Sequence, residues 1–113
     1  MAKNLEVTLL LDYYGELLTQ KQRTITGYYY FDDLSLAEIA QNEGVTRQAV
    51  RDIIRRTEQQ LSELESKLHF AHLISEVTDS LGQLRDMAEN EGGDFAQKVK
   101  TDCAALIKDL LKE

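Results

Sequence analysis

The sequence predicts an all-α fold, a helix-turn-helix bundle extended by long C-terminal helices. The 113-residue chain has no Pro and only six Gly, so helices can run with few interruptions. Apolar residues recur at three- and four-residue spacing, whereas strand-like alternation is hard to find. Residues 36–56 have the spacing of a helix-turn-helix, two short-linked helices that cross steeply. These three observations together predict the fold class.

Two helices are expected before this motif. The first runs from about residue 4 to 17, and its apolar residues form one stripe, made of Val7, Leu10, Leu11, Tyr14, Leu17 and Leu18. Thr19 and Gln22 have the spacing of a capping box and predict the start of the second helix. The residues expected to face inward from it are Ile25, Tyr28 and Tyr29, with Phe31 as a further candidate. The aromatic run 28–31 resembles a base-stacking platform, but its helical spacing favours a core role.

The helix-turn-helix itself begins with a second capping box. Ser35 precedes the short helix 36–42, and Glu38 has the position that completes the box. Ala40 is small enough for the next helix to cross closely. Gly44 can adopt the left-handed backbone that the turn requires, with Val45 packed behind it. A long helix is then expected to follow.

The start of that helix is the candidate nucleic-acid site. Thr46 is expected to cap it, and Arg residues gather on its outer face. The candidate binding residues are Thr46, Arg47, Gln48, Arg51, Arg55 and Arg56. Arg and Gln near the start of a groove-docked helix can read guanine and adenine, whereas Arg55 and Arg56 are better placed for phosphates. The alternative is a solvated helix face, with Arg55 and Arg56 paired to Glu58 or Glu63.

The charge distribution supports a local rather than a general nucleic-acid contact. The net charge of −7 divides into −4 for residues 1–45, which hold three bases and seven acids, and −6 for residues 57–113, which hold six bases and twelve acids. Residues 46–56 hold four Arg and one Asp, a net +3. Because phosphate contact needs cations on one face only, double-stranded DNA is the expected partner, bound selectively.

Beyond residue 56 the sequence predicts an acidic helical tail. We place a helix-turn-helix bundle in residues 1–60 and the tail in residues 61–113, as an extension of the same domain. A heptad seam is expected to form a homodimer through the C-terminal helices, with a register jump at 69–73 that favours a bend over a continuous helix. The seam consists of Val50, Ile54, Thr57, Leu61, Leu64, Leu68, Ile74, Val77, Leu81, Leu84 and Ala88. The last helix follows Gly92-Gly93, and its expected inner face is Phe95, Val99, Cys103, Leu106 and Leu110.

Other chemistries have little support in the sequence. Glu65, His69, His72 and Glu76 would share one face of a continuous helix, but a solvated face explains that spacing at least as well as a metal site. Cys103, the only Cys, has no neighbouring base and is expected to be packed and inert. No nucleophile motif, phosphate loop or cofactor motif is present. We therefore expect a cytoplasmic protein that is not an enzyme and does not insert into a membrane.

The first half of the chain resembles region 4 of bacterial sigma factors. The resemblance rests on residues 18–23, on Tyr30-Phe31-Asp32-Asp33-Leu34-Ser35-Leu36-Ala37-Glu38-Ile39-Ala40, and on Arg47-Gln48-Ala49-Val50-Arg51. In that module the second helix reads promoter DNA. Nothing here resembles the sigma-factor regions that bind core polymerase and melt promoters, so the resemblance does not imply a sigma factor.

Over its whole length the chain resembles the bacterial YlxM family of small helix-turn-helix proteins. Genes of that family commonly lie beside those for the signal recognition particle protein and its receptor. The resemblance therefore implies a link to the signal recognition particle pathway. Two functions are carried forward: a DNA-binding regulator, and a non-catalytic accessory factor that binds the signal recognition particle protein or RNA.

Overall fold

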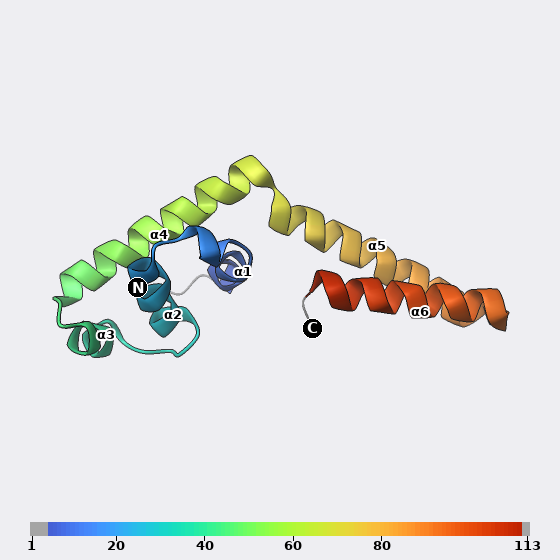
Figure 1. The fold of residues 1–113 in the computed structure, drawn as a ribbon, viewed down its shortest axis with the longest axis horizontal. Helices are drawn as coiled ribbons and strands as arrows, with labels where there is room; N and C mark the ends of the chain where they lie inside the picture. Colours follow the sequence, from blue (N-terminus) through green and yellow to red (C-terminus); the bar gives the residue numbers. More distant parts are fainter. Residues whose placement is uncertain (1–4, 112–113) are drawn as a thin grey trace. The chain divides into compact units, whose positions relative to one another are not determined.

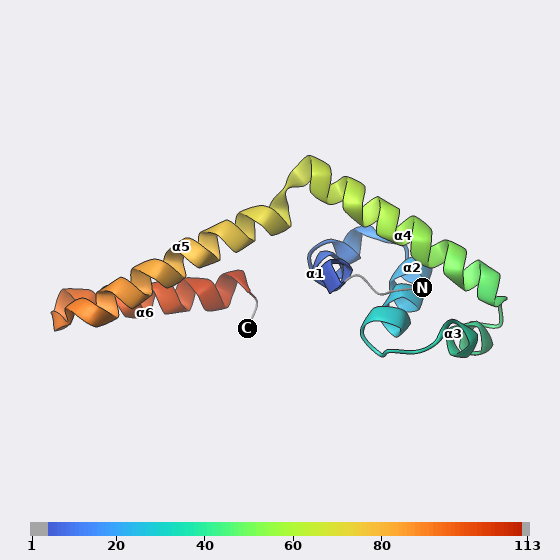
Figure 2. The same cartoon turned by 180° about the vertical axis from the view of Figure 1, so that it is seen from behind.

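The computed structural model describes residues 5–111, and these residues form α-helices joined by short turns, with no β-strand among them. The predicted all-α class is confirmed. The chain divides into two compact units, Met1–His69 and Phe70–Glu113, which we call the N-terminal and C-terminal units. Figures 1 and 2 show α1, α2 and α3 gathered along α4 in the first unit, and α5 and α6 lying antiparallel in the second.

Local sequence signals define most helix ends of the N-terminal unit. Its helices are α1 (Leu5–Tyr14), a 3₁₀ turn (Gly15–Leu17), α2 (Gln20–Tyr30), α3 (Leu36–Glu43) and α4 (Arg47–Leu68). Both predicted capping boxes are confirmed. The Thr19 hydroxyl accepts from the Gln22 amide at 3.2 Å while the Gln22 side chain accepts from the Thr19 amide at 3.0 Å. Ser35 and Glu38 make the same reciprocal pair at 3.1 and 3.0 Å.

The core of the N-terminal unit forms where α4 packs on the three helices before it. Its fully buried side chains come from α2, α3 and α4, and the largest are Ile25, Ile39, Ile54, Leu61, Val50, Thr26 and Thr57. Tyr29 is buried beside them and meets the ring of Tyr30 edge to face at 5.1 Å. The core role predicted for the aromatic run is therefore confirmed for Tyr29, and Tyr28 and Tyr30 pack at the edge of the same cluster.

Two expectations for this unit need correction. The first α-helix stops at Tyr14, and the 3₁₀ turn that follows leaves Leu17 largely exposed while Leu18 is buried. Phe31 is also exposed, because α2 ends at Tyr30 and the chain turns there. The expected first position of α1, residue 4, lies outside the described residues.

Most of the α4 half of the predicted heptad seam is not a free surface, although Leu68 at its end is exposed. Val50, Ile54, Thr57 and Leu61 are all fully buried inside the N-terminal unit. The four- and three-residue spacing is that of a helix packed on its own bundle, which produces the same apolar pattern as a coiled coil. These four residues therefore cannot form a dimer contact while the unit stays folded.

The predicted bend lies at His69. This residue ends α4 in the left-handed conformation, with φ 53° and ψ 26°, and its amide donates to the carbonyl of Glu65 at 2.8 Å. One residue later α5 begins. The continuous helix that was the alternative is thereby excluded.

The C-terminal unit is a hairpin of α5 (Phe70–Glu91) and α6 (Gly93–Leu110), which contact each other along their length. Its buried residues are mostly small, namely Ala71, Ile74, Ala88, Ala96 and Cys103. Gly92 and Gly93, at φ 73° and 90°, make the turn between the helices. Small side chains at the contact allow two helices to pack closely.

This pairing corrects the predicted inner faces of both helices. Val77 and Leu84 were expected in the seam but are exposed. Phe95 was expected inside and is 83% exposed, because its neighbour Ala96 takes the position that faces α5. Cys103 is buried as predicted, whereas Leu106 is half open to solvent.

Candidate nucleic-acid interface

The turn of the helix-turn-helix has the predicted geometry. Gly44 ends α3 in the left-handed conformation, with φ 67° and ψ 33°, and its amide bonds to the carbonyl of Ala40. The Val45 amide donates to the same carbonyl at 3.1 Å, and the Val45 side chain packs against the core. Ala40 itself is buried. The turn thus fixes the crossing of α3 and α4 through a positive φ that glycine adopts at little cost.

Thr46 stabilises the start of α4. Its hydroxyl oxygen accepts from the amide of Ala49 at 3.0 Å, so the predicted cap is confirmed. The residue is exposed. The cap uses an acceptor lone pair of the hydroxyl oxygen. The hydroxyl hydrogen is therefore available to donate to an acceptor in front of the helix.

The basic residues of α4 are exposed to solvent. Arg47, Arg51 and Arg55 follow one another at four-residue spacing and form one row, with Arg56 in the adjacent row. Within residues 5–111 none of the four guanidinium groups takes part in an ion pair. The alternative pairing of Arg55 and Arg56 with Glu58 or Glu63 is therefore not found.

Gln48 has a partner within the same helix. Its side-chain Nε2 donates to Oδ1 of Asp52 at 3.1 Å. Asp52 is half-buried and is the only acidic residue of the segment 46–56. The contact holds the Gln48 amide against the helix surface beside Arg51.

A hollow of about 660 Å³ lies where the first turns of α3 and α4 come together. Residues from both helix starts line it, namely Ser35, Leu36, Ala37, Thr46, Arg47, Gln48 and Arg51. The first amides of a helix have no intrahelical acceptor, and the helix start carries partial positive charge. Two such starts and two Arg side chains therefore make one electropositive recess suited to an anion such as a phosphate.

The hollow brings together four of the six predicted site residues. Thr46, Arg47, Gln48 and Arg51 line it, whereas Arg55 and Arg56 lie farther along α4 and do not. The contribution of Ser35, Leu36 and Ala37 was missed by the sequence analysis. The available signal was the pair of helix caps, Ser35 and Thr46, on either side of the turn. A helix-turn-helix brings the starts of its two helices close together, so residues at both caps can line one recess.

The pKa of Glu38 reflects the hydrogen bonds of the capping box at the start of α3. Hydrogen bonds from the Ser35 backbone and side chain hold the pKa of its carboxyl below the usual value. The carboxylate is fully exposed, so this shift comes from the capping box rather than from burial. Its ionised form therefore supports the helix start that borders the hollow.

The metal set considered from the sequence is not formed. The helix that would have aligned Glu65, His69, His72 and Glu76 ends at Leu68. Glu65 accepts from the Tyr14 hydroxyl at 2.5 Å, and His72 lies 3.2 Å from Glu76 on the surface. No three His, Cys, Asp or Glu side chains in the described part of the chain are arranged to hold a metal ion.

A search for membrane-spanning segments in residues 5–111 finds no helix that combines the required length with sufficient apolar character.

Comparison with known proteins gives one family over most of the chain. Residues 1–101 match the family described as "Putative helix-turn-helix protein, YlxM / p13 like". A UPF0122 protein of Shouchella clausii is 49% identical over 83 residues, 74% of this chain and 76% of the relative. UPF0122 proteins of Clostridium kluyveri and Desulforamulus reducens are each 39% identical, over 99% and 95% of this chain and 94% and 92% of their own length.

Proposed function

The chain belongs to the YlxM / p13-like helix-turn-helix family, and from this premise we propose that it is a DNA-binding regulatory protein without catalytic activity. The observation that carries the proposal is the electropositive recess at the joined starts of α3 and α4. In this proposal the first half of α4 docks in the major groove of double-stranded DNA, as in other helix-turn-helix proteins.

The residues of α4 divide by their distance from the recess. Arg47, Gln48 and Arg51 stand at the helix start, where side chains of a docked helix reach base edges. Arg55 and Arg56 continue the basic surface and are suited to the phosphates that flank the groove. The recess accepts one backbone phosphate on the amides of α3 and α4, with Thr46 beside it.

The contact of Gln48 with Asp52 bears on base preference. With one Nε2 hydrogen engaged by Asp52, the Gln48 carbonyl oxygen and the second Nε2 hydrogen remain to face the groove. A carbonyl accepts from an amino group, such as N6 of adenine or N4 of cytosine. Asp52 also repels phosphates, which favours base contact over non-specific binding at this position.

Selection of duplexes from fragmented genomic DNA, followed by fluorescence anisotropy on the enriched sequence, tests this proposal. Arg51→Ala should weaken binding by about 1–3 kcal/mol and relax base preference, whereas Arg56→Ala should weaken all duplexes alike. Arg85→Ala is the matched control, since it removes the same charge from α5, and should leave affinity unchanged. Equal affinity of Arg51→Ala and the unaltered chain for the selected duplex would rule the proposal out.

A second candidate function is a non-catalytic accessory role that binds the signal recognition particle protein or RNA. The observation that favours it is the acidic charge of residues 57–113, a net −6 from six bases and twelve acids, which is suited to a basic protein. Titration of the full chain with purified particle RNA and protein distinguishes the roles. Binding that survives in the Arg47→Ala, Arg51→Ala double variant favours the accessory role, and binding of duplex DNA alone favours the regulator.

A further inference from the structure

We propose that an exposed apolar face of the α5–α6 hairpin is a self-association surface that pairs two copies of this chain. The inference is independent of the DNA-binding proposal. It shares Val77 and Leu84 with the seam expected in the sequence but excludes the α4 residues of that seam, most of which are buried in the N-terminal unit. The surface, which we call the hairpin face, consists of the exposed side chains Leu73, Val77, Leu84, Met87, Phe95 and Leu106, with the partly buried Val99 between them.

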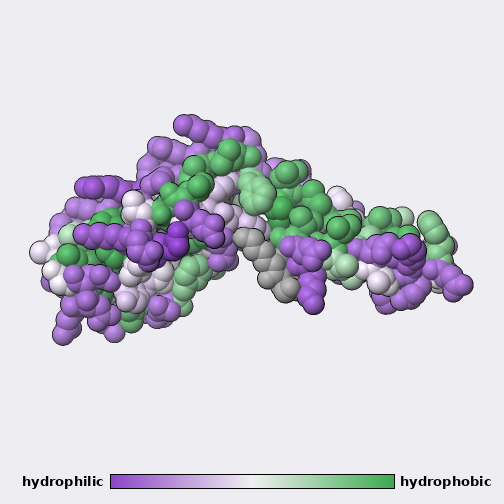
Figure 3. Space-filling model, in the orientation of Figure 1, coloured by the Kyte–Doolittle hydropathy of each residue, from purple (hydrophilic) through white to green (hydrophobic). Residues whose placement is uncertain are grey.

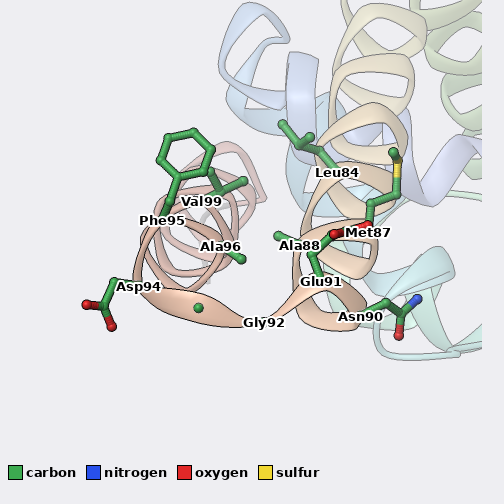
Figure 4. Close-up of a pocket in the computed structure, with 11 residues that line it drawn as sticks. Leu84, Met87, Ala88, Asn90, Glu91, Gly92, Asp94, Phe95, Ala96 and Val99 are labelled. Atoms are coloured by element: carbon green, nitrogen blue, oxygen red, sulfur yellow. The ribbon is translucent and has the colours of Figure 1, made fainter.

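These residues lie on the same side of the hairpin. On each helix they lie beside the buried residues, rotated in the same direction around the helix axis. Val77 lies three residues after the buried Ile74, and Val99 lies three residues after the buried Ala96. Figure 4 shows Leu84 of α5 and Phe95 and Val99 of α6 projecting to one side, with Ala88 and Ala96 turned toward each other between the helices. Figure 3 shows apolar surface along much of α5.

The side chains buried between α5 and α6 are too small to stabilise the hairpin by themselves. Three of its five buried residues are Ala and one is Cys, which leaves Ile74 as the only large buried side chain. The unit has 44 residues, close to the size of about 40 below which a disulfide, a metal or oligomerisation is usually needed for folding. The single Cys excludes an internal disulfide, and the described residues form no metal cluster. Self-association would supply the apolar burial that the hairpin lacks.

The exposed area of the hairpin face is what a dimer requires. Phe95 is 83% exposed and Met87 64%; Leu73, Leu84 and Leu106 are about half exposed, and Val77 and Val99 less so. With side chains of roughly 150–200 Å² each, the face offers on the order of 600 Å² of apolar surface per copy. Two copies would bury roughly 1,200 Å², the lower limit of standard stable interfaces.

The shape of the face fits a second copy of itself. Two hollows lie along it and share Leu84: one of about 380 Å³ is lined also by Leu73, Val77 and Leu81 with Glu76 and Ser80, and the other lies beside Phe95. Phe95 projects from the same surface. In a two-fold pair, a residue that contacts a site on its partner is matched by the reverse contact. Each Phe95 can therefore enter the hollow of the other copy. The two hairpins then form a four-helix bundle in which both Phe95 side chains are buried.

Sedimentation equilibrium of the full chain tests this inference. At about 50 µM, above the micromolar dissociation constant expected for this area, the mass should approach twice 12.9 kDa. Leu84→Glu and Phe95→Glu should each weaken association about tenfold or more, because a carboxylate would be buried without a partner. Leu111→Glu on the opposite side of the hairpin and Leu17→Glu in the N-terminal unit are matched controls with similar exposure, and both should associate normally.

Two further measurements keep the test decisive if a face variant loses helix. The melting temperature of the unaltered chain should rise with protein concentration, since association stabilises the folded state. Association should also strengthen with salt, because residues 70–113 hold nine acids and five bases, a net −4 on each copy. DNA binding weakens as salt is added, so a salt series distinguishes failure of the dimer proposal from failure of the DNA-binding proposal. A single-chain mass at 50 µM with a concentration-independent melting temperature would overturn the dimer.

Discussion

The two units of this chain differ in how much large apolar side chain they bury. The N-terminal unit encloses large side chains completely, among them Ile25, Ile39, Ile54 and Leu61. The C-terminal hairpin encloses mainly Ala and Cys and leaves Leu73, Leu84 and Phe95 in solvent. Similar helical sequence patterns thus give one unit with a core of its own and one whose apolar residues face outward. The difference teaches that apolar periodicity predicts a helix but does not say whether its apolar face is satisfied within the chain.

The largest expected effect separates the two cores. Ile54→Ala should destabilise the N-terminal unit by about 2–5 kcal/mol, because the side chain is fully buried and a cavity remains. Ile74→Ala is the counterpart in α5, and its effect should depend on protein concentration if the proposed association stabilises the hairpin. Amide hydrogen exchange, resolved by segment at two concentrations, measures both. Concentration-dependent protection in α4 would contradict the comparison.

A change of one Gly to Ala should have opposite signs in the two units. Gly44→Ala should destabilise the helix-turn-helix by about 1 kcal/mol, since φ is 67° and an added Cβ meets nothing within 4 Å. The cost is therefore conformational rather than steric. Gly82→Ala inside α5 should stabilise by about 0.5–1 kcal/mol, as a helix-interior Gly is replaced. Urea unfolding followed by circular dichroism measures both, and equal signs would refute the assignment.

The smallest expected effect concerns Glu38. Its pKa is lowered in the folded state by hydrogen bonds from Ser35, so the ionised form stabilises α3 above the pKa of the unfolded chain. That contribution is lost as pH falls through the lowered value. Ser35→Ala keeps the backbone N–H that donates to Glu38 and removes only the hydroxyl, so the NMR titration midpoint of Glu38 should rise part of the way toward its ordinary value. An unchanged midpoint would show that the Ser35 hydroxyl does not contribute to the shift.

Much of the N-terminal unit was predictable because its signals are local. The capping pairs Thr19 with Gln22 and Ser35 with Glu38 each act over three residues, and Gly44 is specified by its own φ. The cap at Thr46 and the exposure of Arg47 and Arg51 follow from the same short-range rules. Neighbouring residues thus contain the information that defines these features.

The features that were mispredicted depend on tertiary contacts. In α5 the residues Ile74, Val77 and Leu81 can be divided into two overlapping stripes, and only the position of α6 decides which one is buried. The spacing of Phe95, Val99 and Cys103 on one helix face predicts that Phe95 is inside, yet its neighbour Ala96 faces the partner helix. The recess at the starts of α3 and α4 likewise requires two segments to approach, which spacing in one sequence does not specify.

Cys103 gives the chain a chemical reporter of one unit. Its thiol is buried against α5 and is the only thiol in the sequence. A thiol reagent can reach it only when the hairpin opens, so the labelling rate equals the open fraction multiplied by the rate for an unprotected thiol. The unaltered protein can therefore be used to measure opening of the C-terminal unit alone, with and without bound DNA, while the N-terminal unit contributes no signal.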